Sequence, residues 1–237
     1  DYTQAMQALD QALALDGQRY GLYLLQADLF ARLNQPAGQL ASLQSALNLQ
    51  PAHADVQMRA ALLLRQANDL PGALLHAEQS VLHASAANAA LPAEDDTLLH
   101  SARLLAAELA YLLMRTHKAW AWVHDDLAEP KPPCEHFEHA CLRAEMALDA
   151  GDAALAGENL AILRRTTPQQ LRVMADQARL TRLGDNPSQA EGLFDAAQEL
   201  FTQAAALEGG EAITDIGQLA NLRTLCCAAL ELHRWDA

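Results

Sequence analysis

The sequence is poor in aromatic residues and lacks long apolar runs. Aromatic side chains make up 5% of the 237 residues, whereas hydrophobic residues, mainly Ala and Leu, make up 51%. No stretch of about 18 uninterrupted apolar residues occurs, because Arg103, Glu108 and Arg115 interrupt the most apolar region. We therefore expect no membrane span, and the Ala/Leu composition is typical of closely packed helices.

Basic residues and cysteines are also few. The chain has 16 Lys and Arg against 30 Asp and Glu, a formal net charge of −14. Such a surface repels phosphate backbones, which argues against nucleic acid as a partner. The four cysteines, including the adjacent Cys226 and Cys227, do not form the pattern of a disulfide framework. This usage favours a reducing, cytoplasmic location and leaves a periplasmic one open.

The sequence contains none of the common catalytic motifs. There is no GxSxG, HExxH or P-loop sequence, and no GxGxxG that follows a strand. No nucleophile and base stand in a pattern that suggests a catalytic pair. The period-2 alternation that would indicate β-strands is missing as well. We expect an all-α protein without a β-sheet that is not an enzyme and binds no cofactor.

What the sequence does contain is an internal repeat of 34 residues, first seen between 1–51 and 35–85. At three positions of the repeat, side-chain size is conserved between the copies better than residue type. The equivalent residues are Leu9, Leu43 and Ala77; Ala12, Ala46 and Ser80; and Leu13, Leu47 and Val81. A unit of this length is a helix pair that buries its apolar face by stacking on neighbouring units. The sequence therefore predicts a helical repeat array.

Following the period along the chain marks seven starts of a second helix. They lie at Asp1, Gln35, Asp69, Lys118, Asp152, Asn186 and Arg234, with steps of 34, 34, 49, 34, 34 and 48 residues. The two long steps indicate insertions near 84–95 and 206–213. Periodicity and helix breakers predict about 12 helices, near 2–15, 19–33, 36–49, 53–67, 70–87, 96–116, 118–128, 134–150, 152–165, 168–183, 188–208 and 212–233.

The segment Tyr23-x-x-Gln26-Ala27-x-x-Phe30, followed by Leu43, Ala46 and Pro51, resembles the signature of the tetratricopeptide repeat (TPR) family. Gln26, Gln39 and Ser85 depart from the residues that the family prefers. The resemblance covers most of the chain, most strongly 1–85 and 140–200, and implies a right-handed α-solenoid of antiparallel helix pairs.

The resemblance also has consequences for domain organisation. It implies one solenoid over 1–237 that is cut within a repeat at both ends, so that Asp1 opens inside a repeat rather than in a secretory signal. The Pro-rich turn 130–133 is either a hinge that divides the chain into 1–129 and 134–237 or a long turn within one array.

In the TPR family a peptide or a partner's helix lies in a concave groove lined by the first helix of each unit. The resemblance therefore implies a protein–protein interaction scaffold with a protein or peptide partner. The alternative is a regulatory or substrate-positioning segment of a larger transferase, secretion or signalling protein, and self-association also stays open. The groove-facing positions of the family fall here on Asp28, Arg32, Arg59, Arg65, Tyr111, Arg115, Glu145, Asp149, Arg172, Arg179, Arg182 and Arg223.

Three of these arginines allow two interpretations. Arg172, Arg179 and Arg182 are seven and three residues apart, so they share a helix face. Their guanidinium groups could bind carboxylates of an acidic peptide. They could instead pair with Glu145, Asp149 and Asp176 of neighbouring helices, which is the more ordinary outcome in stacked helices.

One short segment carries four residues that could bind a metal, namely Cys134, His136, His139 and Cys141. On a single helix, however, the two cysteines and the two histidines lie on different faces. A tetrahedral zinc site made from all four would require the helix to unwind. We therefore expect no metal site, with packed cysteines and solvent-facing histidines.

Overall fold

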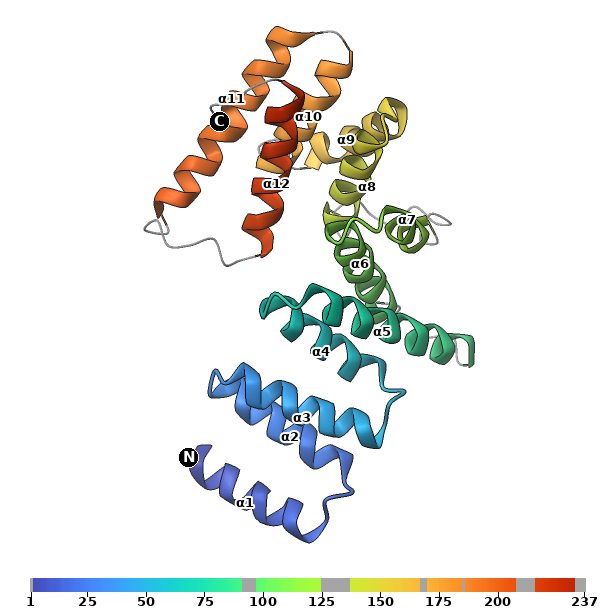
Figure 1. The fold of residues 1–237 in the computed structure, drawn as a ribbon, viewed down its shortest axis with the longest axis vertical. Helices are drawn as coiled ribbons and strands as arrows, with labels where there is room; N and C mark the ends of the chain where they lie inside the picture. The colour runs from blue at the N-terminus through green and yellow to red at the C-terminus, as the bar shows by residue number, and fades with distance from the viewer. Residues whose placement is uncertain are drawn as a thin grey trace. The chain divides into compact units, whose positions relative to one another are not determined.

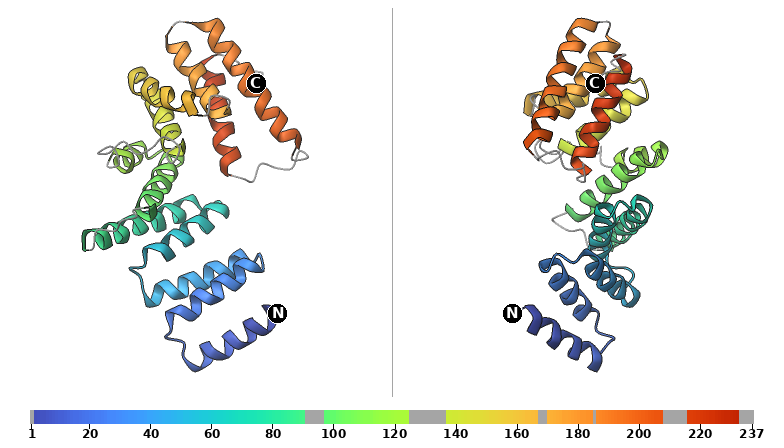
Figure 2. Two further views of the ribbon diagram at one scale, coloured as in Figure 1. Left: turned by 180° about the vertical axis from the view of Figure 1, so that it is seen from behind. Right: turned by 60° about the vertical axis from the view of Figure 1, so that its left-hand side comes forward.

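The computed structural model describes residues 2–90, 97–124, 137–166, 170–184, 186–207 and 216–232, and this part of the chain forms helices joined by turns, without a strand. Figures 1 and 2 show the helices arranged largely as adjacent pairs. The described helices are α1 (Tyr2–Leu15), α2 (Tyr20–Arg32), α3 (Pro36–Leu49), α4 (Ala54–Gln66), α5 (Leu70–Ala90), α6 (Thr97–Leu112), α7 (Thr116–His124), α8 (Phe137–Asp149), α9 (Ala153–Thr166), α10 (Leu171–Leu183), α11 (Pro187–Leu207) and α12 (Ile216–Glu231).

The helices fall into two compact units, Asp1–Asp126 and Leu127–Ala237. In unit 1 the pairs are α2 with α3, α4 with α5 and α6 with α7, and α1 packs on α2. In unit 2 the pairs are α8 with α9 and α10 with α11, and α12 packs on both α10 and α11. The Pro-rich turn at 130–133, where a hinge was one of two interpretations, lies outside the described residues.

The turn between the two helices of a pair recurs with the same geometry. One residue adopts a positive φ, and the next N–H donates to the carbonyl five residues earlier, as in a Schellman motif. The positive-φ residues are Asn34 (54°), Asn68 (60°), Met114 (58°) and Gly151 (74°). The bonds run from Gln35 to Phe30 (2.9 Å), Asp69 to Leu64 (2.9 Å), Arg115 to Ala110 (2.8 Å) and Asp152 to Ala147 (2.8 Å).

The recurring turn corrects two of the expected boundaries. The expected start at Lys118 is wrong, because the turn at Met114 ends α6 at Leu112 and places Arg115 before α7. The steps from Asp69 are therefore 115 − 69 = 46 and 152 − 115 = 37, rather than 49 and 34. The first part of the insertion expected near 84–95 is helical, because α5 continues without a break to Ala90.

The small residues of the repeat lie in the core, as the period predicts. Leu43, Ala46 and Leu47 are buried, as are Ala77, Ser80 and Val81 at the equivalent positions of α5. In unit 1 Leu43, Ala46 and Leu47 join a cluster with Ala27 and with Val56 and Ala60 of α4. In unit 2 the core contains Cys141, Ala144, Leu160, Leu163 and Val173, and a second cluster surrounds Phe194. Stacking of one pair on the next thus closes each core.

Candidate interaction face

Ion pairs link the first helices of successive pairs in unit 1. Arg59 of α4 pairs with Asp28 of α2, and Nη1 of Arg65 lies 2.9 Å from Oε2 of Glu108 on α6. These side chains keep between 27% and 54% of their surface exposed, so each pair is worth roughly 1 kcal/mol or less. We call the side of α2, α4 and α6 that carries these four residues the first-helix face.

Apolar side chains stand between the ion pairs on the first-helix face. Leu25 lies one helical turn from Asp28 and is 56% exposed. On α4, Leu62 lies three residues from both Arg59 and Arg65, and Met58 lies seven residues, or two helical turns, before Arg65. On α6, Leu104 lies four residues before Glu108, and all three apolar side chains are half-buried. Arg32, at the end of α2, is exposed and forms no ion pair with the described residues. The face therefore combines open apolar groups with charge.

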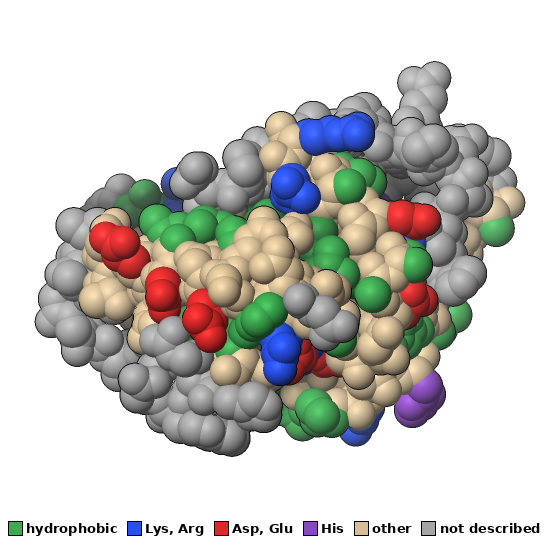
Figure 3. All heavy atoms as spheres, turned by 90° about the horizontal axis from the view of Figure 1, so that it is seen from above, with side chains coloured by type: hydrophobic (Ala, Val, Ile, Leu, Met, Phe, Trp, Pro, Cys, Tyr) green, Lys and Arg blue, Asp and Glu red, His purple; other side chains and the backbone are tan. Residues whose placement is uncertain are grey.

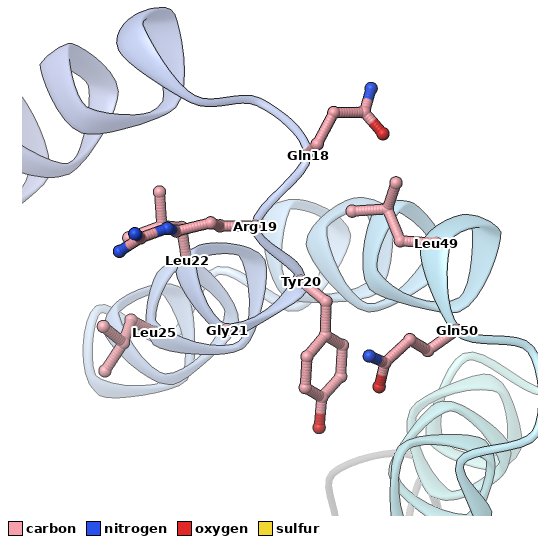
Figure 4. A pocket seen from close by; sticks show the side chains of 8 residues that line it. All are labelled: Gln18, Arg19, Tyr20, Gly21, Leu22, Leu25, Leu49 and Gln50. Atoms are coloured by element: carbon pink, nitrogen blue, oxygen red, sulfur yellow. The ribbon is translucent and has the colours of Figure 1, made fainter.

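An open hollow of about 550 Å³ borders this face where α1 leads into α2 (Figure 4). Leu22 and Leu25 line it from α2, and Tyr20 and Gln50 lie side by side at its other end. The ring of Tyr20 also lies 5.3 Å from the ring of His53. Leu25 lines the hollow and lies one helical turn from Asp28, so the hollow adjoins the first-helix face at α2.

Two residues expected in the groove of unit 1 lie elsewhere. Tyr111 is 2% exposed and belongs to the core, because the last turn of α6 places it inward. Arg115 follows α6 in the turn and is exposed there. Neither side chain is part of the first-helix face.

Unit 2 carries a denser network of ion pairs, centred on α8, α10 and α12. Glu145 of α8 is 3% exposed and accepts hydrogen bonds from Nε of Arg172 (2.9 Å) and from Oγ1 of Thr224 (2.9 Å). Nη1 of Arg223 lies 3.4 Å from the other carboxylate oxygen of Glu145. The carboxylate of Glu145 therefore holds the three helices together.

Arg179 forms the second centre of this network and is buried, with 2% exposure. Its Nη2 donates to Asp149 of α8 and to Glu231 of α12, both at 2.7 Å. Nη2 of Arg223 also lies 3.3 Å from Oδ2 of Asp149. For Arg172 and Arg179 the structure therefore shows the internal pairing, and neither guanidinium presents an open surface. Arg182 is half-buried and has no ion pair with the described residues.

Asp176 lies beside Arg179 on α10 without a hydrogen bond. It is 1% exposed, neither carboxylate oxygen has a hydrogen-bond partner, and Nη1 of Arg179 is 3.6 Å away. Burial, and then the negative charge of Glu145, raise the pKa of Asp176 well above its ordinary value. The sequence indicated that Asp176 could be an ion-pair partner, but it did not indicate that the carboxyl group accepts no hydrogen bond.

The described residues contain no cluster of three or more side chains that could hold a metal ion. His139 is 6% exposed and Cys141 1%, so the expectation of a solvent-facing histidine is wrong for His139. Cys134 and His136 lie outside the described residues. None of the helices in the described part of the chain is long and apolar enough to span a membrane.

Acidic and basic side chains are interspersed with apolar ones on the face shown in Figure 3. The described side chains of neither sign cover that face as a continuous field.

Solved structures share this arrangement of helices. YrrB, described as a TPR protein with an unusual peptide-binding site, is 15% identical and matches with a TM-score of 0.62 over 86% of this chain and 98% of its own. A tetratricopeptide repeat protein from Parabacteroides merdae is 15% identical and matches with a TM-score of 0.57 over 90% of this chain and 78% of its own. The chain has a TPR fold.

The TPR fold is also found in part of a longer chain. A chain in the structure of Naa15/Naa10 bound to HypK-THB is 20% identical and matches with a TM-score of 0.52 over 96% of this chain and 31% of its own. No protein-family model and no curated protein matches the sequence. At these identities the likeness establishes the fold alone.

Within this TPR fold, nine of the twelve residues expected to face the groove fall into two groups. Asp28, Arg32, Arg59 and Arg65 lie on the first-helix face of unit 1, with apolar side chains between them. In unit 2 the expected residues Glu145, Asp149, Arg172, Arg179 and Arg223 form one ion-pair network. Sequence position alone could not separate these groups, because both carry charges at the same repeat positions.

Proposed function

We propose that the chain is a non-enzymatic protein-interaction scaffold that binds a peptide or helix of a partner protein on the first-helix face of unit 1. The observation that carries this proposal is the 56% exposure of Leu25 on α2, together with the half-buried Met58 and Leu62 of α4 and Leu104 of α6. Apolar side chains of a partner would bury this surface, and the hollow next to Leu25 has room for one of them.

The charged groups of the face would set the orientation of the partner. Arg32 is exposed without an ion pair among the described residues, so a partner carboxylate can reach it without breaking an existing pair. Arg59 and Arg65 are already paired with Asp28 and Glu108 and would mainly hold α2, α4 and α6 in position. YrrB, which has the same fold and a described peptide-binding site, supports a peptide as the ligand.

The proposal is tested with peptides selected from a displayed random library on the full chain. Dissociation constants of the selected peptides are then measured by fluorescence anisotropy for the wild type, Leu25→Asp and Leu75→Asp. Leu75 is the matched control, because it is a leucine of unit 1 with 58% exposure that lies on α5, a second helix. We expect Leu25→Asp to weaken binding by tenfold or more and Leu75→Asp by less than twofold. Equal affinity for the wild type and Leu25→Asp would place the site elsewhere.

A second proposal is that the chain is a regulatory or substrate-positioning segment of a larger protein. The match to 31% of the longer chain in the Naa15/Naa10 structure favours it. In that case the first-helix face would contact another part of the same polypeptide. Cross-linking mass spectrometry on the protein as expressed in its source cells distinguishes the two, because it reports whether the cross-links from this face stay within one polypeptide.

A further inference from the structure

The network of unit 2 has more acidic than basic members. Its cations are Arg172, Arg179 and Arg223, and its carboxyl groups are Glu145, Asp149, Asp176 and Glu231. With all seven of these groups ionised, their charges would sum to one negative charge in excess. That excess would lie in a region where Glu145, Asp176 and Arg179 are each 3% exposed or less.

Asp176 differs from the other three carboxyl groups. Glu145, Asp149 and Glu231 each accept a hydrogen bond from an arginine at 2.9 Å or less. Asp176 accepts none, although it is the most buried of the four. An ionised carboxylate without donors is strongly disfavoured in such a place, whereas a protonated one is not. With Asp176 neutral, three guanidinium groups face three carboxylates.

Within the described residues, the charged side chains of the neighbouring elements lie mostly outside this network. The charged side chains of α9 and α11 are all exposed, namely Glu158, Arg164, Arg165, Glu191, Asp195 and Glu199. Arg182 of α10 is half-buried, and Arg143 of α8 faces Glu158. Cys227 of α12 adjoins the network, and burial raises the pKa of its thiol, so it stays neutral there.

We propose that Asp176 carries a proton in the folded chain and acts as a pH-dependent switch, its ionisation loosening α12 from α8 and α10. The switch lies in unit 2 and is independent of the binding face proposed for unit 1. The proton matters because it leaves three guanidinium groups opposite three carboxylates in a buried network that joins α8, α10 and α12. Loss of the proton places a fourth negative charge beside Glu145 and Asp149.

The sign of the pH dependence follows from linkage. The folded chain retains the Asp176 proton at pH values where an exposed aspartate, with its ordinary pKa near 4, has lost it. An opening of α12 that exposes Asp176 to water therefore becomes easier as pH rises above about 4, by up to about tenfold in the opening equilibrium for each pH unit. The effect levels off once Asp176 ionises in the folded state.

The first test is a carbon-13 NMR titration of the full chain with labelled aspartate carboxyl groups. Asp176→Asn assigns the resonance and mimics the shape of the protonated acid. We expect the Asp176 resonance to titrate well above those of exposed aspartates, within the pH range in which the chain stays folded. Titration together with the exposed aspartates overturns the proposal, as does the absence of any titration before unfolding.

The second test is hydrogen exchange of α12 in the full chain, measured by mass spectrometry across pH and corrected for the intrinsic exchange rate. Wild type and the control Glu191→Gln, an exposed carboxyl of α11, should lose protection of α12 as pH rises. Asp176→Asn should keep it. Equal pH dependence in all three proteins overturns the switch, and so does a failure of Asp176→Asn to fold, since a site that holds a neutral acid should accept a neutral side chain of the same shape.

Discussion

Gly38 of α3 lies directly against the ring of Phe30 on α2. A Cβ added at Gly38 would come within 2.7 Å of Cδ1 and 2.8 Å of Cε1 of Phe30, closer than side-chain atoms approach one another. The missing side chain therefore lets the two helices of this pair approach.

The first prediction is that Gly38→Ala destabilises the protein. Replacing a helical glycine by alanine normally stabilises by up to about 1 kcal/mol. Here overpacking against Phe30 should reverse the sign and cost about 1–3 kcal/mol. The matched control is Gly192→Ala in α11, where an added Cβ meets nothing within 4 Å. Urea denaturation followed by circular dichroism measures both, and equal stabilisation by the two substitutions would show that the ring of Phe30 moves aside.

The second prediction concerns Met114, which has a φ of 58° and is 78% exposed. Met114→Gly should stabilise by about 0.5–1 kcal/mol, because it removes the steric cost of a left-handed residue without losing packing. Gly151→Ala, at the equivalent turn with φ 74° and free space around it, should destabilise by a similar amount. The two are compared by urea denaturation, and shifts of the same sign would contradict the account.

The same turns explain where sequence reasoning succeeded. Asn34, Asn68 and Gly151 are residue types that readily adopt a positive φ, so the helix ends near them were predictable. Met114 carries no such signal, and the helix expected over 96–116 ends at Leu112 instead. A local sequence pattern thus predicts the end of a helix where the residue in the turn itself favours a positive φ. It misses the end of a helix where tertiary packing imposes the turn on another residue type.

The site shows a different limit. The 34-residue period predicted which helices stack and hence that Arg172 and Arg179 could meet Glu145, Asp149 and Asp176. It did not predict Glu231, which lies 52 residues beyond Arg179 and follows an irregular step of the repeat. The period also did not predict that Asp176 accepts no hydrogen bond. That outcome depends on which of the nearby carboxylates accept hydrogen bonds from the guanidinium groups.

The third prediction separates buried from exposed ion pairs. Arg179→Met should destabilise by about 2–3 kcal/mol, because it removes a buried guanidinium shared by Asp149 and Glu231. The expected cost is below that for fully buried partners, since Asp149 and Glu231 keep 34% and 36% of their side-chain surface exposed. Arg59→Met should cost less than about 1 kcal/mol, because its pair with Asp28 is open to water. Thermal and urea denaturation test this, and equal costs would mean that burial does not decide the strength of these pairs.

The fourth prediction is a loss of stability at acid pH through His76. Nδ1 of His76 lies 2.6 Å from Oε1 of Gln57, whose Nε2 donates to the carbonyl of Pro51, so this chain of bonds ties α5 to the turn before α4. Burial lowers the pKa of His76, and the negative charge of Asp69 opposes this in part.

Because the pKa of His76 is lower in the folded state, the unfolded chain binds its proton first. Stability is therefore present above the ordinary histidine pKa of about 6.5 and is lost as pH falls through the lower folded value. Urea denaturation at several pH values between 7.5 and 5 should show wild type losing stability relative to His76→Gln. His117→Gln, which changes an exposed histidine on α7, serves as the control and should follow the wild type. A His76→Gln curve parallel to the wild type over this range would show that the pKa of His76 is not lower in the folded chain than in the unfolded one.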